Sequence, residues 1–440
     1  MEIKKIMKFG GTSVGSPDKF RALIPLINDG ETNMVVVSAM SGTTNSLIEI
    51  TDLMNCGETD KAKEKINILG QKYRQTVEDL FETKEFKHKG KEFVNLRFDL
   101  ISEVVLDEYT KSKEKLVHAQ GELLSTTLLH MLLTEKGINS TLLQALNFMR
   151  IDKDGEPDYY YIEENIKREL RKEPPSNIII TQGFICRNAY GEVDNLKRGG
   201  SDYSASIIGA VLNVREIQIW TDIDGFHNND PRYVENTGVI RKLSFDEAAE
   251  LAYFGAKILH PSSVAPARMK NIPVRLKNTM HPEDEGTIIV SEESFSDYKA
   301  VAAKDGITVI RIKSAHMLMA YGFLRKVFEI FEAYRTPIDM VATSEVSVSL
   351  TIDDTTNLEG IVKELKKLGA VSVEHDQTIV CVVGDFRPET RGSAPEIFEA
   401  LDNITLKMIC YGGSSHSLSL LIDTKNKVEA LRQLSKNLFK

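Results

Sequence analysis

Two glycine pairs, each preceded by a basic residue, are the segments of this chain best suited to bind an anion. One is Lys8-Phe-Gly-Gly-Thr-Ser13 and the other is Lys197-Arg-Gly-Gly-Ser-Asp202. Glycine lets backbone N–H groups approach a phosphate or carboxylate closely, and the first turn of a helix adds unpaired N–H groups. Neither segment has the spacing of a P-loop or a dinucleotide-binding turn. Either one alone would also suit an ordinary tight turn, so it is their recurrence that suggests a divided binding site.

Three further segments carry charged groups in places that suit a binding site. The loop from Thr221 to Arg232 holds three acids, a histidine and an arginine, Lys257 lies in an apolar stretch, and Glu122 follows a glycine. Each has a plain structural alternative: a solvated loop, a lysine whose stem covers apolar surface, or a surface carboxylate. No Ser/His/Asp arrangement and no zinc-ligand spacing stands out.

The elements that must position these groups alternate between strands and helices. Apolar runs at 34–37, 177–181 and 216–221 indicate buried strands, and helical patterns cover about 18–27 and 202–212, with several helices between 47 and 136. Strands that alternate with helices predict a largely parallel sheet covered by helices. Because both glycine pairs follow strands, we expect the binding groups at the carboxyl ends of the sheet.

An internal repeat follows a polar boundary at 291–297. The pattern S-x-x-S-x-S-L-x-I-D begins at Ser344 and again at Ser414, an offset of 414 − 344 = 70 residues. Each unit has the pattern strand, helix, strand, strand, helix, and the first adds a strand at 370–373. The equivalent strand of the second unit would begin at residue 440. We therefore predict that the units are intertwined, with a strand near 299–303 lent from one to the other.

Composition narrows the class of protein. The 440 residues include 55 Lys and Arg against 64 Asp and Glu, a net charge of −9 that disfavours a dedicated nucleic-acid binder. No apolar run approaches the roughly 20 residues that span a bilayer, so we expect a cytoplasmic protein without a membrane partner.

Together the motifs resemble the aspartokinase family. The similar segments are Lys8–Ser13, Ser38–Asn45, Gly121-Glu122, Arg198–Asp202, Thr221–Arg232 and Phe254–Pro261. The resemblance implies an amino-acid kinase fold at 1–290 and two intertwined, ferredoxin-like ACT domains at 300–376 and 377–440. It also implies transfer of the ATP γ-phosphoryl group to the side-chain carboxylate of L-aspartate. Such a carboxylate is already ionised at pH 7, so the reaction needs no general base.

The resemblance also assigns roles to residues. Lys8 would neutralise charge on the transferred group and Asp202 would orient Lys8. The implied L-aspartate contacts are Thr44, Glu122, Arg198, Gly199, Gly200 and Ser201. The implied ATP contacts are Lys8, Gly10, Gly11, Thr221, Asp222, His227, Asp230, Arg232 and Lys257. Related sequences commonly have tyrosine at the position of His227. Mg²⁺ is expected with ATP, without a named protein ligand.

The ACT repeats imply regulation by an amino acid. The predicted effector residues are Met317, Gly322, Phe323, Leu324, Asp339, Thr343, Ser344 and Glu345. Two acids near a helix N-terminus suit a ligand with two amines and one carboxylate, so we predict feedback inhibition by L-lysine, with threonine and methionine left open. Ordinary strand-end charges are the plain alternative for Asp339 and Glu345. ACT repeats also imply a homodimer or homotetramer.

Two other functions remain open. One is a kinase for another carboxylate substrate, although such relatives generally lack the double repeat. The other is a non-catalytic amino-acid sensor, which would be expected to lose Lys8 or Asp202.

Overall fold

The computed structural model describes residues 2–196, 199–255, 258–292, 298–314, 317, 321–387 and 393–439. Contacts between residues divide the chain into two compact units. The first consists of 1–226, 241–245 and 259–292, and the second of 227–240, 246–258 and 293–440. Two stretches that precede the repeats, 227–240 and 246–258, therefore group with them.

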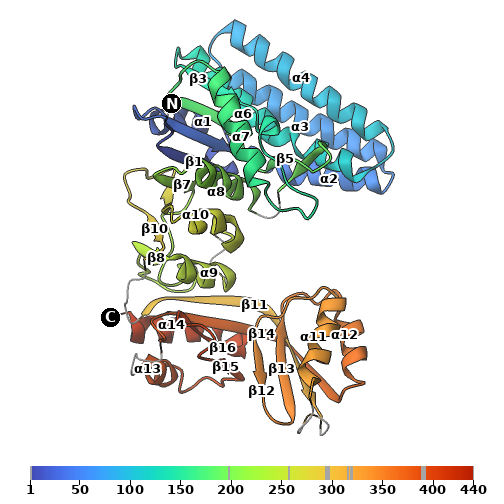
Figure 1. The fold of residues 1–440 in the computed structure, drawn as a ribbon, viewed down its shortest axis with the longest axis vertical. Coiled ribbons are helices and arrows are strands. Elements are labelled where there is room, and N and C mark those ends of the chain that lie inside the picture. Colours follow the sequence, from blue (N-terminus) through green and yellow to red (C-terminus); the bar gives the residue numbers. More distant parts are fainter. Residues whose placement is uncertain are drawn as a thin grey trace. The chain divides into compact units, whose positions relative to one another are not determined.

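Figure 1 labels the elements along the chain. The helices are α1 (Pro17–Ile27), α2 (Thr43–Asn55), α3 (Thr59–Leu80), α4 (Lys84–Leu106), α5 (Lys111–His118), α6 (Gln120–Glu135), α7 (Tyr159–Lys172), α8 (Gly200–Leu212), α9 (Phe245–Tyr253), α10 (Ala265–Met269), α11 (Phe323–Ala333), α12 (Leu358–Leu365), α13 (Ser393–Ala400) and α14 (Lys427–Leu438). The strands are β1 (Lys5–Phe9), β2 (Asn33–Val37), β3 (Ser140–Leu143), β4 (Ile178–Gln182), β5 (Ile185–Arg187), β6 (Val193–Asn195), β7 (Glu216–Thr221), β8 (Lys242–Ser244), β9 (Val274–Asn278), β10 (Thr287–Val290), β11 (Tyr298–Lys313), β12 (Val341–Thr343), β13 (Ser347–Ile352), β14 (Ala370–Gly384), β15 (Met408–Cys410) and β16 (Ser417–Asp423).

The first unit is built on one eight-stranded sheet in the order β3-β4-β2-β1-β7-β9-β10-β8. The strands from β3 to β9 pair in parallel, β10 runs antiparallel to β9, and β8 is parallel to β10. The predicted, largely parallel sheet is confirmed, together with its helical cover. The carboxyl ends of β2, β1 and β7 consequently lie side by side at one edge.

Strand residues alternate between two buried faces of this sheet. On one face, Met7 and Phe9 join a core with residues of α1, α2, α3, α4 and α6. Ile6 of the same strand is also fully buried but points to the opposite face, where α8 contacts β1 and β7. Burial on both faces explains why these strands are continuous apolar runs.

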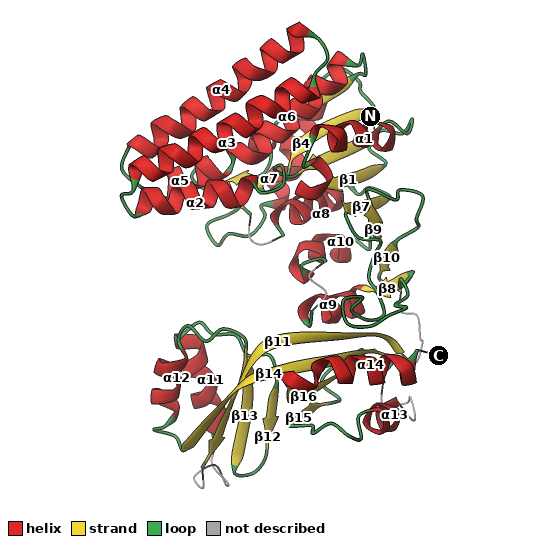
Figure 2. Cartoon of the chain, turned by 180° about the vertical axis from the view of Figure 1, so that it is seen from behind, coloured by secondary structure: helices red, strands yellow, loops and turns green. Residues whose placement is uncertain are grey.

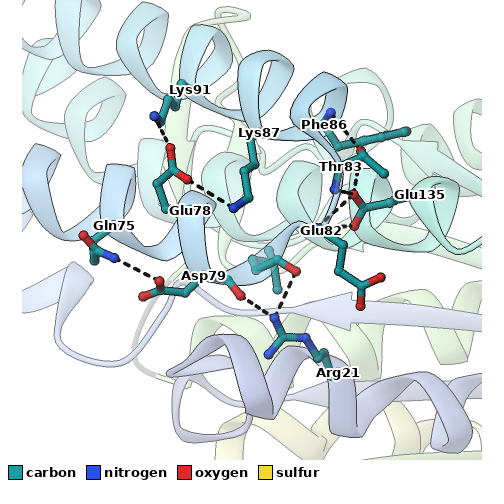
Figure 3. A network of polar contacts seen from close by, with 11 residues as sticks. Arg21, Gln75, Glu78, Asp79, Glu82, Thr83, Phe86, Lys87, Lys91 and Glu135 are labelled. Atoms are coloured by element: carbon teal, nitrogen blue, oxygen red, sulfur yellow. Dashed lines mark hydrogen bonds and ion pairs between the residues drawn. The ribbon is translucent and has the colours of Figure 1, made fainter.

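Helix α6 is held at its far end by a polar network with α3 and α4 (Figure 3). The Glu135 carboxylate accepts hydrogen bonds from the backbone N–H groups of Glu82 and Thr83, the latter at 2.8 Å. It thereby satisfies donors at the start of α4 that the helix cannot satisfy itself. Lys87 and Lys91 of α4 both pair with Glu78 of α3. Glu135 thus ties the last turn of α6, the helix whose first turn carries Glu122, to the residues that precede α4.

The second unit contains a six-stranded sheet in the order β12-β13-β11-β14-β16-β15. Figure 2 shows β11 and β14 as long strands that run side by side. The part of β11 from Ile307 onward pairs with β13 and the start of β14, whereas its first part, Tyr298–Lys304, pairs with the end of β14 at 379–384. A strand of the first repeat is thus lent to the second, as predicted from the repeat.

Among the helices described, none combines the length and the apolar character that crossing a bilayer requires.

Candidate active site

The turns after β1, β2 and β7 surround one cavity of about 370 Å³. It is lined by Gly11, Thr12, Ser38, Ala39, Met40, Ser41, Gly42, Thr44, Asn45, Thr221 and Asp222. Three segments that the sequence singled out therefore meet at the carboxyl ends of neighbouring parallel strands, where ligands of such sheets bind. A larger hollow of about 1070 Å³ lies at the other ends of β1 and β7, near Lys4 and Arg215, away from these turns.

Gly11 brings the β1 turn close to the β2 turn. A Cβ atom at this position would lie 2.8 Å from the carbonyl oxygen of Ala39, which a side chain cannot tolerate. The Ser41 N–H donates to the Gly11 carbonyl at 3.1 Å and joins the two turns. The glycine is therefore required by a close backbone approach, and it leaves the cavity wall free of side chains at this point.

Lys8 and Asp202 form an ion pair at the same edge of the sheet. The Lys8 Nζ atom lies 2.6 Å from Oδ1 of Asp202, and the two side chains are only 12% and 13% exposed. Asp202 stands in the first turn of α8, after the left-handed residue Gly199 (φ 74°) that caps the helix. Asp202 thus lies in direct contact with Lys8, and its role in orienting Lys8 stays a prediction.

Glu122 is a buried carboxylate without an ion-pair partner among the described residues. Its Oε1 atom accepts a hydrogen bond from the Ala39 N–H at 3.2 Å, while Oε2 is buried without a hydrogen-bond partner in that part of the chain. Burial raises the pKa of the Glu122 carboxyl to about 8, against smaller lowering effects of the Ala39 N–H and of Lys8. Such a group is suited to bind a ligand ammonium ion, which would restore the missing charge partner.

The start of α8 holds Gly199, Gly200 and Ser201, three of the predicted aspartate contacts. Ser201 packs against Gly183 at the end of β4, because a Cβ atom on Gly183 would lie 2.6 Å from the Ser201 side chain. Gly200 is buried and begins the helix. Arg198 lies outside the described residues. Thr44 lines the cavity from the first turn of α2, and Ser201 lies in the first turn of α8.

The predicted ATP contacts divide between the two units. Thr221 and Asp222 belong to the first unit and line the cavity, whereas His227, Asp230 and Arg232 belong to the second. Lys257 lies outside the described residues.

Hydrogen bonds within the loop fix the residues of the second unit. His227 Nδ1 lies 2.8 Å from Thr237 Oγ1, and the Arg232 guanidinium donates to both carboxylate oxygens of Asp230. Partial burial acts to raise the pKa of Asp230, but the hydrogen bonds from Arg232 lower it below its usual value.

Two residues of α3 hold the cavity loop and were not identified from the sequence. Lys72 Nζ donates to the Ser41 carbonyl at 2.8 Å, and the buried Tyr73 hydroxyl lies 2.9 Å from Thr43 Oγ1. Helical periodicity places Tyr73 on the buried face of α3, but nothing in the sequence indicates that its hydroxyl meets Thr43. They act on the loop that carries Thr44 and do not themselves line the cavity.

The predicted effector residues fall at two ends of one small sheet. Met317 and the N-terminus of α11, begun by Gly322 (φ 79°), follow the end of β11. At that end the Ser314 backbone N–H donates to the Val346 carbonyl, beside the turn of Thr343, Ser344 and Glu345. Phe323 and Leu324 are the first two residues of α11.

Asp339 is not brought to that end of the sheet. It precedes β12, and its backbone N–H bonds Thr351 near the other end of β13. Six residues of extended chain from Asp339 to Glu345 span roughly 20 Å, so one chain does not gather these acids at one point.

Metal ligation by protein side chains finds no support in the part of the chain described. No three His, Cys, Asp or Glu side chains cluster there in a way that could hold a metal ion.

Comparison with protein families identifies two regions. Residues 4–278 match the amino acid kinase family, and residues 380–438 match an ACT domain. Among curated proteins, lysine-sensitive aspartokinase 3 of Escherichia coli (strain K12) is 32% identical over 99% of this chain and 99% of its own length.

Solved structures with a similar fold are also aspartokinases. E. coli aspartokinase III in complex with aspartate and ADP (R-state) superposes with a TM-score of 0.83 at 31% identity, covering 99% of this chain and 100% of that one. The same enzyme in complex with lysine and aspartate (T-state) gives a TM-score of 0.80 at the same identity and coverage.

Proposed function

The chain belongs to the aspartokinase family, and on that premise we propose that it transfers the γ-phosphoryl group of ATP to the side-chain carboxylate of L-aspartate. The observation that carries this proposal is the combination of the oriented Lys8–Asp202 pair with the unpaired carboxylate of Glu122 at one edge of the sheet. The first suits a transferred phosphoryl group, and the second suits the ammonium group of an amino acid.

The chemistry asks little of the protein beyond positioning and charge. The attacking carboxylate of L-aspartate is ionised at neutral pH, so no residue has to remove a proton from it. Lys8 would stabilise the negative charge that spreads over the equatorial oxygens in the transition state, and its pairing with Asp202 holds it in place before the substrate arrives. Glu122 would bind the α-ammonium group and so orient the side-chain carboxylate for attack.

ATP would be held by the turn of Gly10 and Gly11 and by Thr221 and Asp222, which follow the neighbouring parallel strands β1 and β7. The structure fits a phosphate there: a Cβ atom on Gly10 would stand 3.5 Å from Lys8 Nζ, so the missing side chain leaves room for an anion beside that cation. His227, Asp230, Arg232 and Lys257 would complete the nucleotide contacts. Mg²⁺, which neutralises phosphate charge when bound, would be carried mainly by phosphate oxygens and water.

The test is release of ADP from Mg-ATP in the presence and absence of L-aspartate. L-Aspartate should stimulate release in the wild type, and Lys8→Ala should reduce that stimulated rate by about 100-fold or more, because it removes a charge that acts on the transition state. Lys4→Ala is a matched control just before the same strand: Lys4 is 43% exposed at its side chain and contacts only Glu2 among the ion pairs described.

Two results would contradict the proposed activity. A wild type that releases ADP equally without L-aspartate would exclude aspartate as the acceptor. Stimulation by another amino acid in place of L-aspartate would instead support a kinase for a different carboxylate.

We further propose feedback inhibition by L-lysine through the ACT domains. The N-terminus of α11 would receive the lysine carboxylate, and the exposed turn at 343–345 supplies Glu345 for an amine. Adding L-lysine to the assay should inhibit the wild type. Inhibition by threonine or methionine alone would reassign the effector.

Asp339 suggests that the effector site is completed by a second copy of the chain. A lysine molecule is far shorter than the roughly 20 Å of strand between Asp339 and Glu345, so both acids can act on one ligand only if Asp339 comes from the partner subunit. This supports a homodimer formed through the ACT domains. Light scattering should show a dimer or tetramer rather than a monomer.

A further inference from the structure

Asp339 is already occupied by groups of its own chain. Its Oδ1 atom lies 2.7 Å from Lys304 Nζ and accepts a 2.6 Å hydrogen bond from the Tyr253 hydroxyl. Lys304 also pairs with Asp353 at 2.9 Å, and its Nζ stands 4.2 Å from the centre of the Tyr253 ring. The Asp339 side chain is 1% exposed, whereas Asp353 and Tyr253 at the rim of the cluster are 39% and 43% exposed.

The cluster joins the regulatory sheet to helix α9. Tyr253 is the last residue of α9, while Lys304 belongs to β11. The chain that leaves α9 also lies against β11, since a Cβ atom on Gly255 would be 2.4 Å from the Ala303 carbonyl oxygen. Lys257, a predicted ATP contact, follows Tyr253 by only four residues in the sequence.

The cluster holds a charged lysine yet leaves one acceptor unused. Burial acts to lower the pKa of Lys304, but the hydrogen bonds to Asp339 and Asp353 raise it above its usual value of 10.5. Oδ2 of Asp339 is buried without a hydrogen-bond partner among the described residues. A buried carboxylate oxygen without a donor is a costly arrangement, which favours any state in which Asp339 turns toward an additional cation.

We propose that the Asp339 carboxylate is shared between two alternatives: the internal Lys304–Tyr253 pair seen here, and an ammonium group of the amino-acid effector. Lys304 thereby competes with the effector, and Tyr253 transmits the outcome to α9. This inference rests on the proposed regulation by L-lysine.

Two consequences follow from competition for one carboxylate. Removing the internal competitor leaves Asp339 free for the effector and tightens effector binding. Removing the Tyr253 hydroxyl disconnects Asp339 from α9, so effector binding changes the affinity for ATP less than in the wild type.

The test is calorimetric titration of the full-length enzyme with L-lysine. Lys304→Met should bind L-lysine at least tenfold more tightly than the wild type, and Lys304→Arg, which keeps the charge, should remain near the wild type. Tyr253→Phe should bind L-lysine at least as tightly, while the increase in the KM for ATP that L-lysine causes falls to half or less. Lys367→Met is the matched control, because Lys367 is an exposed lysine of the same domain that pairs only with Glu364 in the contacts described.

Each result has a separate meaning. Equal or weaker L-lysine binding by Lys304→Met, with a wild type that binds, overturns the competition and leaves lysine regulation standing. An unchanged ATP response in Tyr253→Phe overturns the transmission to α9. If neither the wild type nor Lys304→Met binds L-lysine, the effector assignment fails and the competition fails with it.

Discussion

The first unit, called the kinase unit below, and the second unit, which contains the ACT repeats and is called the regulatory unit, each contain a buried carboxylate with one oxygen that has no described partner. The two carboxylates differ in their neighbours. Glu122 in the kinase unit receives a single backbone N–H and no cation that pairs with it among the described residues. Asp339 in the regulatory unit receives a lysine ammonium and a tyrosine hydroxyl. Burial therefore favours the protonated form of Glu122 in the unliganded kinase unit, whereas Asp339 has a cation of its own chain as partner.

This difference has a physical consequence for each unit. An unpaired buried carboxylate retains its proton to higher pH, so the ionised form becomes favourable when a cationic ligand arrives. A carboxylate that already has a cationic partner stays ionised without a ligand. A ligand ammonium group must displace that partner to reach it. The first arrangement suits substrate binding at every turnover, and the second suits a switch.

The largest expected effect is a loss of stability when a buried ion pair of the regulatory unit is broken. Glu247 and Lys299 are both 5% exposed and lie 2.6 Å apart, joining α9 to β11. Lys299→Met leaves Glu247 as a buried charge without that partner and should lower the free energy of unfolding by about 3 kcal/mol. Urea unfolding measures this, with Lys313→Met, an exposed position on the same strand, as the control. If Lys299→Met and Lys313→Met have the same free energy of unfolding, internal pairing of buried charge does not stabilise the regulatory unit, and the comparison with Glu122 fails.

Glu122→Gln should instead weaken L-aspartate binding strongly and change the free energy of unfolding little. Loss of a charged partner for the substrate ammonium should weaken L-aspartate binding by about 2 kcal/mol, roughly 30-fold. The unliganded protein should be about as stable as the wild type at neutral pH, because the raised pKa keeps buried Glu122 largely protonated and the glutamine amide is likewise neutral. Glu103→Gln, an exposed position on α4, serves as the control. A destabilised Glu122→Gln enzyme with a normal KM would show that Glu122 is structural.

The pH dependence of L-aspartate binding should show the smallest of these effects. Folded Glu122 keeps its proton until about pH 8 and the unfolded carboxyl loses it near 4.5, so unliganded stability falls as pH rises through that window. Substrate binding has the opposite sign, because the ammonium group needs the ionised carboxylate. L-Aspartate affinity should therefore rise by about 20-fold from pH 6.5 to 8.5. A flat profile in the wild type, equal to that of Glu122→Gln, would contradict the raised pKa.

Much of the fold and several site residues could be predicted from local patterns. Buried strands such as β2 and β7 are apolar runs bounded by glycine or polar turns, and the 70-residue repeat indicated the strand exchange now seen in β11 and β14. Lys8 and Asp202 stand directly beside glycine turns, so their neighbourhood was visible in the sequence. Parallel pairing then brings such turns together, because the carboxyl ends of adjacent parallel strands share one edge.

Contacts between distant segments could not be predicted in the same way. The sequence contains Glu122, Tyr73 and Lys304, but periodicity does not indicate which side chain meets another. The predicted effector set placed Asp339 beside Glu345, whereas strand geometry separates them within one chain.

The sequence by itself determined the elements, the repeat and the cationic glycine turns, because these depend on short-range patterns of size, polarity and backbone freedom. The tertiary structure decided which charges are paired. Among the described residues Glu122 has no counterion, whereas Asp339 contacts Lys304 and Tyr253, residues 35 and 86 positions away along the chain. Desolvation and ion pairing depend on three-dimensional neighbours, so only the folded chain could distinguish these two buried carboxyl groups.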